Sequence, residues 1–184
     1  LVIGHNASTR EELKEMIEQK RWSELIREIP IKKGDFIQID PGTVHAIKGG
    51  FQILETQQNS DITYRVYDYD RLSNGKPREL HVQKSIDVIT VPAKPVGESV
   101  RSVNGLPLNR LNLLYSCNYY SVFKLEVSGN TQVEQKYPFL LMTVVSGQGS
   151  VNGHLLKKGD HFIAPADCKS LNFEGNMQII ASTR

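Results

Sequence analysis

The sequence has no membrane-length apolar run, no dense basic segment and only two cysteines. No stretch of its 184 residues approaches the ~18 consecutive apolar residues that a membrane span needs. A net charge of +2 is too small to indicate a nucleic-acid or membrane partner. Cys117 and Cys168 lack any close spacing, which predicts free thiols in a reducing compartment. These absences predict a cytoplasmic protein that binds neither nucleic acid nor membrane.

The chain also lacks an initiator methionine. It starts with the apolar residues Leu1 to Ile3 and turns polar soon afterwards, which is unlike a secretory signal. These first residues resemble the end of a strand, so we expect a piece of a longer protein. With 39% hydrophobic and 23% charged residues, the chain can still bury a core.

Helical spacing is confined to the front of the chain, over residues 9–29. Thr9 and Glu12 have the spacing of a capping box, and apolar residues then recur every three or four positions. The pattern breaks near Arg21, and Pro30 ends it. One helix or two short ones are therefore predicted.

After Pro30 the pattern has a period of two, with β-branched and aromatic residues between Gly- and Pro-containing turns. Short strands at such spacing predict a barrel or a sandwich. Residues 92–110 carry several prolines and glycines and read as a connector. The predicted strands are 35–39, 51–54, 63–67, 85–91, 119–127, 140–146, 149–151, 161–165 and 177–181.

A weak internal repeat links the two halves. Residues 31–35 (Ile-Lys-Lys-Gly-Asp) resemble residues 156–160 (Leu-Lys-Lys-Gly-Asp), and the Gly-Asp pair in each predicts a tight turn that leads into a strand. Eleven residues after the glycine, the first copy has His45 and the second has Ser170. If these positions are equivalent, the first copy can bind a metal and the second cannot.

The segment around His45 resembles the second signature motif of the cupin superfamily. The motif runs from Gly34 through Asp40 and Gly42 to His45, with Asp40 where cupins usually have proline. The longer run 41–71, which contains ETQQNSD and TYRVYDYDR, closely resembles the bacterial short-form type I mannose-6-phosphate isomerases. The run HVQKSIDVI at residues 81–89 also fits that family, and so does the helix predicted over residues 9–29.

This resemblance implies a zinc enzyme in which several side chains bind the metal. It assigns His45 as the last zinc ligand and places the earlier ligands before Leu1. It further implies that Arg65 is catalytic and that Glu55 and Asp61 line the substrate pocket. The implied reaction interconverts mannose 6-phosphate and fructose 6-phosphate through a cis-enediol.

The residue types suit that chemistry. Zinc can polarise the substrate oxygens, Arg65 can hold a phosphate or an enediolate, and Glu55 or Asp61 can move protons. Each residue also has a structural alternative. His45 could be structural, Arg65 could pair with a surface aspartate, Glu55 could be exposed, and Asp61 could cap a turn.

The resulting prediction is a mainly β protein made of cupin-type jelly-roll barrels with a short helical insertion. Residues 1–91 would be the carboxy-terminal part of the catalytic barrel, 92–110 a connector, and 111–184 a second, metal-free barrel.

The substrate would be a sugar phosphate, and unpaired strand edges predict self-association. The alternatives are a non-catalytic carbohydrate-binding or structural cupin module, or a cupin oxygenase, which would need further histidines. The proton-transferring base and the phosphate anchors stay open.

Overall fold

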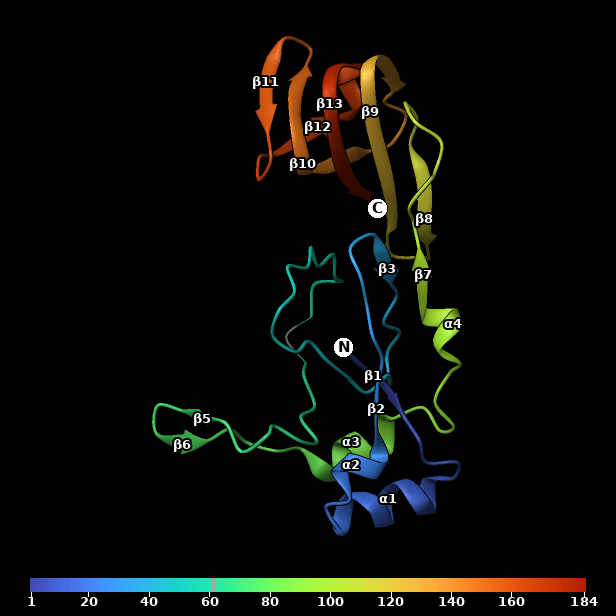
Figure 1. Ribbon diagram of the computed structural model, residues 1–184, viewed down its shortest axis with the longest axis vertical. Helices are drawn as coiled ribbons and strands as arrows, with labels where there is room; N and C mark the ends of the chain where they lie inside the picture. Colours follow the sequence, from blue (N-terminus) through green and yellow to red (C-terminus); the bar gives the residue numbers. More distant parts are fainter. Residues whose placement is uncertain (61) are drawn as a thin grey trace. The chain divides into compact units, whose positions relative to one another are not determined.

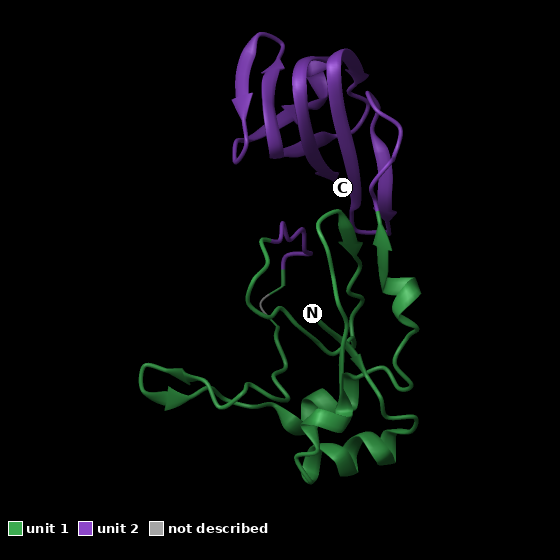
Figure 2. Ribbon diagram, in the orientation of Figure 1, with its two compact units in different colours: residues 1–52, 60–102 green, residues 53–59, 103–184 purple. Residues whose placement is uncertain are grey.

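The computed structural model describes residues 1–60 and 62–184 (Figure 1). The chain divides into two compact units, coloured separately in Figure 2. Unit 1 consists of Leu1–Gln52 and Ser60–Ser102, and unit 2 of Ile53–Asn59 and Val103–Arg184. The division at residue 102 falls inside the segment 92–110 that was predicted to be a connector. The predicted boundaries at residues 91 and 110 stay a prediction.

Unit 1 combines short strands with four short helices. The strands β2, β1 and β4 form a three-stranded antiparallel sheet, while β3 pairs with β7 and β5 pairs with β6. The elements are β1 (Val2–His5), α1 (Arg10–Glu18), α2 (Trp22–Leu25), β2 (Ile26–Glu28), β3 (Asp35–Ile37), β4 (His45–Ala46), β5 (Leu72–Ser73), β6 (Lys76–Pro77), α3 (Val82–Val88), α4 (Val96–Ser99) and β7 (Val100–Ser102).

The helical prediction is confirmed as two short helices. Thr9 caps α1, since its hydroxyl accepts a hydrogen bond from the Glu12 amide at 3.1 Å. The chain breaks at Arg21 and resumes in α2. The apolar face of α1 packs with α2 and α3 in a buried cluster whose fully or nearly fully buried members are Ala7, Leu13, Met16, Ile17, Leu25, Ile86 and Ile89.

Three predicted strands are wrong. Residues 85–91 were predicted as a strand because of their β-branched content, but most of them lie in helix α3. Burial of Ile86 and Ile89, three residues apart, fits a helix that packs on one face. The segments 51–54 and 63–67 form no strand. A strand needs a hydrogen-bonding neighbour, and no described strand pairs with either segment.

Unit 2 is a six-stranded antiparallel sheet wrapped around one core. The strand order is β11-β10-β13-β9-β8, and β12 also pairs with β10. Its elements are β8 (Asn112–Ser116), β9 (Ser121–Glu134), β10 (Phe139–Val151), β11 (His154–Lys157), β12 (His161–Pro165), the 3₁₀ turn η1 (Ala166–Cys168) and β13 (Ser170–Thr183). Alternate residues of β9, β10 and β13 face the core, including Leu125, Leu140 and Ile179, all with 0% exposure.

A row of three glycines crosses this sheet. Gly129 on β9, Gly175 on β13 and Gly149 on β10 are direct neighbours in the register. Gly129 and Gly175 have φ values of 76° and 111°, which other residues rarely adopt. A Cβ on Gly175 would lie 2.6 Å from the Cα of Gly149, so the two backbones approach closely here. The row therefore permits a departure from extended backbone midway along the long strands.

The prediction of a mainly β fold is confirmed, with the helical insertion near the front of the chain. None of the described helices is long and apolar enough to cross a membrane. Both cysteines are free thiols, as predicted.

Candidate active site

The two copies of the repeat have the same local geometry. Gly34 and Gly159 have φ values of 89° and 93°. The carboxylate of Asp35 accepts the Lys32 amide at 2.9 Å, and that of Asp160 accepts the Lys157 amide at 2.8 Å. The latter bond holds the pKa of Asp160 below its ordinary value. The repeat prediction is thus confirmed for the turns.

His45 is the first residue of β4, and Ser170, its counterpart in the repeat, is the first residue of β13. The backbone of His45 pairs with Ile3 on β1. The Nδ1 atom of the His45 ring lies 2.9 Å from the carbonyl oxygen of Thr43. A carbonyl can only accept, so Nδ1 is the donor, and in the neutral ring Nε2 then keeps its lone pair. Because the side chain is exposed, that lone pair is open to an incoming ligand.

The turn before His45 is fixed by contacts with the end of helix α3 and the residues after it. Gly42 has a φ of 80°, and a Cβ there would lie 2.7 Å from the carbonyl oxygen of Val88. The amide of Thr90 donates to the carbonyl of Gly42 at 3.0 Å. The buried His5 ring in turn contacts the carbonyl of Thr90 through Nε2 at 2.9 Å. This packing requires glycine at position 42 and holds the loop that presents His45.

Arg65 is anchored by residues at the start of α3. Its amide donates to Nδ1 of His81 at 3.2 Å, and the amide of His81 donates to the Arg65 carbonyl at 2.7 Å. One guanidinium nitrogen of Arg65 donates to the carbonyl of Glu79 at 3.3 Å. The guanidinium has five N–H donors, so this bond leaves most of them for an anion. The sequence reasoning assigned no role to His81, although it lies in the run that carried the family resemblance.

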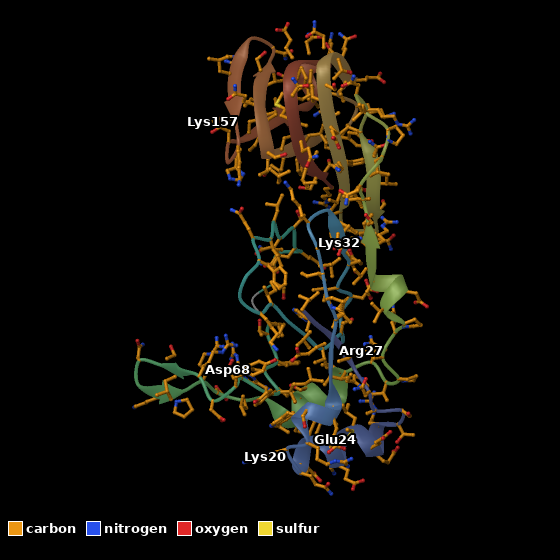
Figure 3. The ribbon with its side chains drawn as sticks, viewed as in Figure 1. Lys20, Glu24, Arg27, Lys32, Asp68 and Lys157 are labelled. Atoms are coloured by element: carbon orange, nitrogen blue, oxygen red, sulfur yellow. The ribbon has the colours of Figure 1, made fainter. Side chains whose placement is uncertain are left out.

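Asp68 stabilises the segment that follows Arg65. Its carboxylate is 7% exposed and accepts hydrogen bonds from Arg71 at 3.0 Å and from Arg78 at 2.7 Å. Figure 3 labels Asp68. The hydrogen bond from Arg78 is the main cause that holds the pKa of Asp68 below its ordinary value. Nearby, the ring of Tyr67 stacks on Trp22 at 4.5 Å. Asp68, one of the aspartates considered as a partner of Arg65, is therefore paired with two other arginines.

No described contact brings the other two residues of the expected pocket, Glu55 and Asp61, to His45 or Arg65. Glu55 is exposed and belongs to the segment 53–59 of unit 2, whereas His45 and Arg65 belong to unit 1. Asp61 lies outside the described residues. The roles of Glu55 and Asp61 stay predictions.

His45 is not joined by further metal ligands within residues 1–60 and 62–184. No group of three or more His, Cys, Asp or Glu side chains in that part of the chain could hold a metal ion. The protonation pattern of His45 fits one zinc ligand, but a structural zinc site uses four protein ligands and a catalytic site three. The described residues alone therefore do not make a zinc site.

Comparison with known proteins agrees with the fold. Residues 109–184 match the family described as "Mannose-6-phosphate isomerase, cupin domain". Residues 109–184, which carry the six-stranded sheet, thus match a cupin domain. The relatives and a solved structure that the chain resembles are mannose-6-phosphate isomerases as well.

Two bacterial relatives match almost the whole chain. It is 43% identical to mannose-6-phosphate isomerase of Streptococcus mutans over 189 residues and 46% identical to ManA of Bacillus subtilis over 187 residues. Both matches cover 99% of this chain, but 58% and 59% of the relatives. A crystal structure of the Bacillus subtilis mannose 6-phosphate isomerase superposes with a TM-score of 0.87 at 42% identity, covering 100% of this chain and 60% of that one. The chain therefore spans about three fifths of the length of these relatives.

Proposed function

We propose that this chain forms part of a zinc-dependent isomerase that interconverts mannose 6-phosphate and fructose 6-phosphate through a cis-enediol. The observation that carries the proposal is the 43–46% identity to two mannose-6-phosphate isomerases over 99% of the chain. Because these matches cover almost the whole chain, they include the segment that carries His45 and Arg65. The free thiols Cys117 and Cys168 fit a cytoplasmic location.

In this proposal His45 provides one zinc ligand through Nε2. The bond from Nδ1 to the Thr43 carbonyl sets the tautomer and orients the ring, as the outer partner of a metal-bound histidine commonly does. Bound zinc would supply Lewis acidity at the substrate oxygens. Since the described residues provide one ligand of the required set, the complete metal site depends on groups beyond them.

Arg65 is proposed to bind the negative charge of the phosphate or the enediolate. Its backbone is held on both sides by His81, and one guanidinium nitrogen is held by Glu79. A guanidinium fixed in this way stabilises developing charge without having to reorganise during the reaction. We propose Glu55 and Asp61 as substrate-binding residues that can hold or move a proton at the sugar hydroxyls.

A chimera tests the proposal. The part of Bacillus subtilis ManA that this chain does not match would be joined to the 184 residues, and turnover of mannose 6-phosphate would be followed in a coupled assay with and without added zinc. We expect zinc-dependent turnover by the chimera and none by the 184 residues alone. A folded chimera without turnover would contradict the proposal and favour a non-catalytic cupin module.

Self-association is also proposed, since β4 contributes an edge to the small sheet of unit 1 and an open edge can pair with another chain. Sedimentation of the 184-residue chain over a range of concentrations tests this. A monomer at all concentrations would refute it.

A further inference from the structure

Unit 2 has an open groove of about 1010 Å³ along its sheet. This volume is comparable to that of ligand sites in other proteins. The groove is lined by residues of β9, β10, β11 and β13 and contains Gly147, Gly149 and Gly175. Because glycines have no side chain, the groove is bordered there by backbone.

The strand register places polar side chains along this groove in two rows. In the first, Gln148 on β10 lies opposite Asn176 on β13. In the second, Glu174 on β13 has Ser150 on one side and Asn130 on the other. Directly opposite residues point to the same face of a sheet.

The core confirms which face this is. Phe173 and Met177 are 1% and 3% exposed and point into the core, so Glu174 and Asn176 point outward. Asn130, Gln148, Glu174 and Asn176 are all exposed.

These four side chains have unused hydrogen-bonding groups. In the part of the chain that the structure describes, none of them makes a side-chain hydrogen bond or an ion pair. Polar neighbours outside the groove are engaged, for example Gln132, which donates to Asn172 at 3.0 Å. Three amides and one carboxylate provide donors and acceptors side by side.

The charge of the groove argues against an anionic ligand. Lys157 on β11, labelled in Figure 3, is the cation that lines the groove, and it forms an ion pair with Asp160 at 3.5 Å. Glu174 adds a negative charge. A phosphate would therefore meet a neutralised lysine and a carboxylate.

We propose that this groove binds a neutral saccharide of one or two rings. Each sugar hydroxyl both donates and accepts, and neighbouring hydroxyls match the paired groups of Asn, Gln and Glu side chains. From β11 to β9 the groove crosses three strand spacings of about 4.8 Å each, which gives room for a second ring. The proposal is independent of the isomerase proposal, because the groove lies within unit 2 and its test needs no turnover.

The test is a nuclear magnetic resonance titration of the ¹⁵N-labelled 184-residue chain with mannose, maltose, cellobiose, glycerol and inorganic phosphate. We expect saturable shifts with at least one disaccharide, weaker shifts with mannose, and none with glycerol or phosphate. The shifted signals should belong to residues 128–130, 147–150 and 174–176 and to the three amide side chains.

Two variants localise the binding. Asn176→Ala should weaken the affinity about tenfold, since it removes one or two hydrogen bonds of ordinary strength. Gln132→Ala removes an exposed amide from the same sheet outside the groove and should leave the affinity unchanged. The proposal is overturned if no saccharide gives saturable shifts in the groove, if phosphate or glycerol gives the same shifts, or if both variants bind equally well.

Discussion

The amide of Arg65 donates to Nδ1 of His81 at 3.2 Å while the amide of His81 donates to the carbonyl of Arg65 at 2.7 Å. The two lie sixteen positions apart, so this reciprocal contact joins an irregular segment to the start of helix α3. It determines where the Arg65 backbone lies. A side chain that acts on a substrate needs such support, because a displacement of about 1 Å can cost ~10²-fold in rate.

The first prediction concerns Arg65 in the chimera described above. Arg65→Ala should lower kcat/KM by ~10³-fold, because the fixed positive charge is lost where negative charge develops. Steady-state kinetics measures this, and circular dichroism verifies the fold. Arg110→Ala, which removes an exposed arginine in unit 2, is the matched control. Near-normal turnover by Arg65→Ala would show that Arg65 is structural.

The second prediction concerns zinc binding by the 184 residues alone. Binding should be weak, since each absent ligand removes affinity and geometric control. Calorimetric titration of the metal-free chain measures it. His45→Ala should remove the residual binding, whereas His154→Ala, which removes an exposed histidine of β11, should not change it. Tight one-to-one binding by the unaltered chain, together with turnover of mannose 6-phosphate, would contradict this view.

The third prediction is that residues 111–184 hold no transition metal. Ser170 occupies the position that matches His45, and Nδ1 of His161 is already 2.8 Å from the hydroxyl of Thr143. Crystals grown with zinc should show no anomalous signal within these residues. A peak there at full occupancy would show that the second barrel is not metal-free.

The fourth prediction concerns the pH dependence of stability. Burial lowers the pKa of His5, while the ring in the unfolded chain titrates near 6.5. Below pH 6.5 the unfolded chain therefore binds more protons than the folded chain. The free energy of unfolding consequently decreases as the pH is lowered, by at most about 1.4 kcal/mol per pH unit. Urea denaturation between pH 5 and pH 7.5 measures this slope.

The variant His5→Gln keeps a donor for the Thr90 carbonyl but does not titrate. It should flatten the slope, whereas His154→Gln, at an exposed position, should preserve it. An unchanged slope in His5→Gln would show that another group causes the pH dependence.

The amino-acid sequence could predict those features of the structure that depend on local interactions. The capping of α1 by Thr9 spans three residues, and the turns at Asp35 and Asp160 each close over three residues as well. Such contacts depend on neighbours along the chain. The family resemblance also selected Arg65 and His45 before any geometry was known.

The prediction failed where a non-local partner decides the structure. Residues 85–91 are rich in β-branched side chains, yet residues 85–88 lie in helix α3, which ends at Val88, because Ile86 and Ile89 pack in one cluster with residues of α1 and α2. Segments 51–54 and 63–67 have strand-like sequences but no strand beside them in the described chain. Intrinsic preference of a few tenths of a kcal/mol to about 1 kcal/mol per residue does not outweigh tertiary packing.

The amino-acid order was thus sufficient for the resemblance to mannose-6-phosphate isomerases, the mainly β fold and the two Gly-Asp turns, whereas the roles of His45 and Arg65 stay predictions. Only the tertiary structure revealed that His81 holds Arg65 and that Thr43 sets the tautomer of His45. It alone aligned Gly129, Gly175 and Gly149 across three strands and placed four unpaired polar side chains in one groove. The reason is physical: a turn is closed by adjacent residues, whereas a site is assembled from strands and loops that meet only when the hydrophobic core forms.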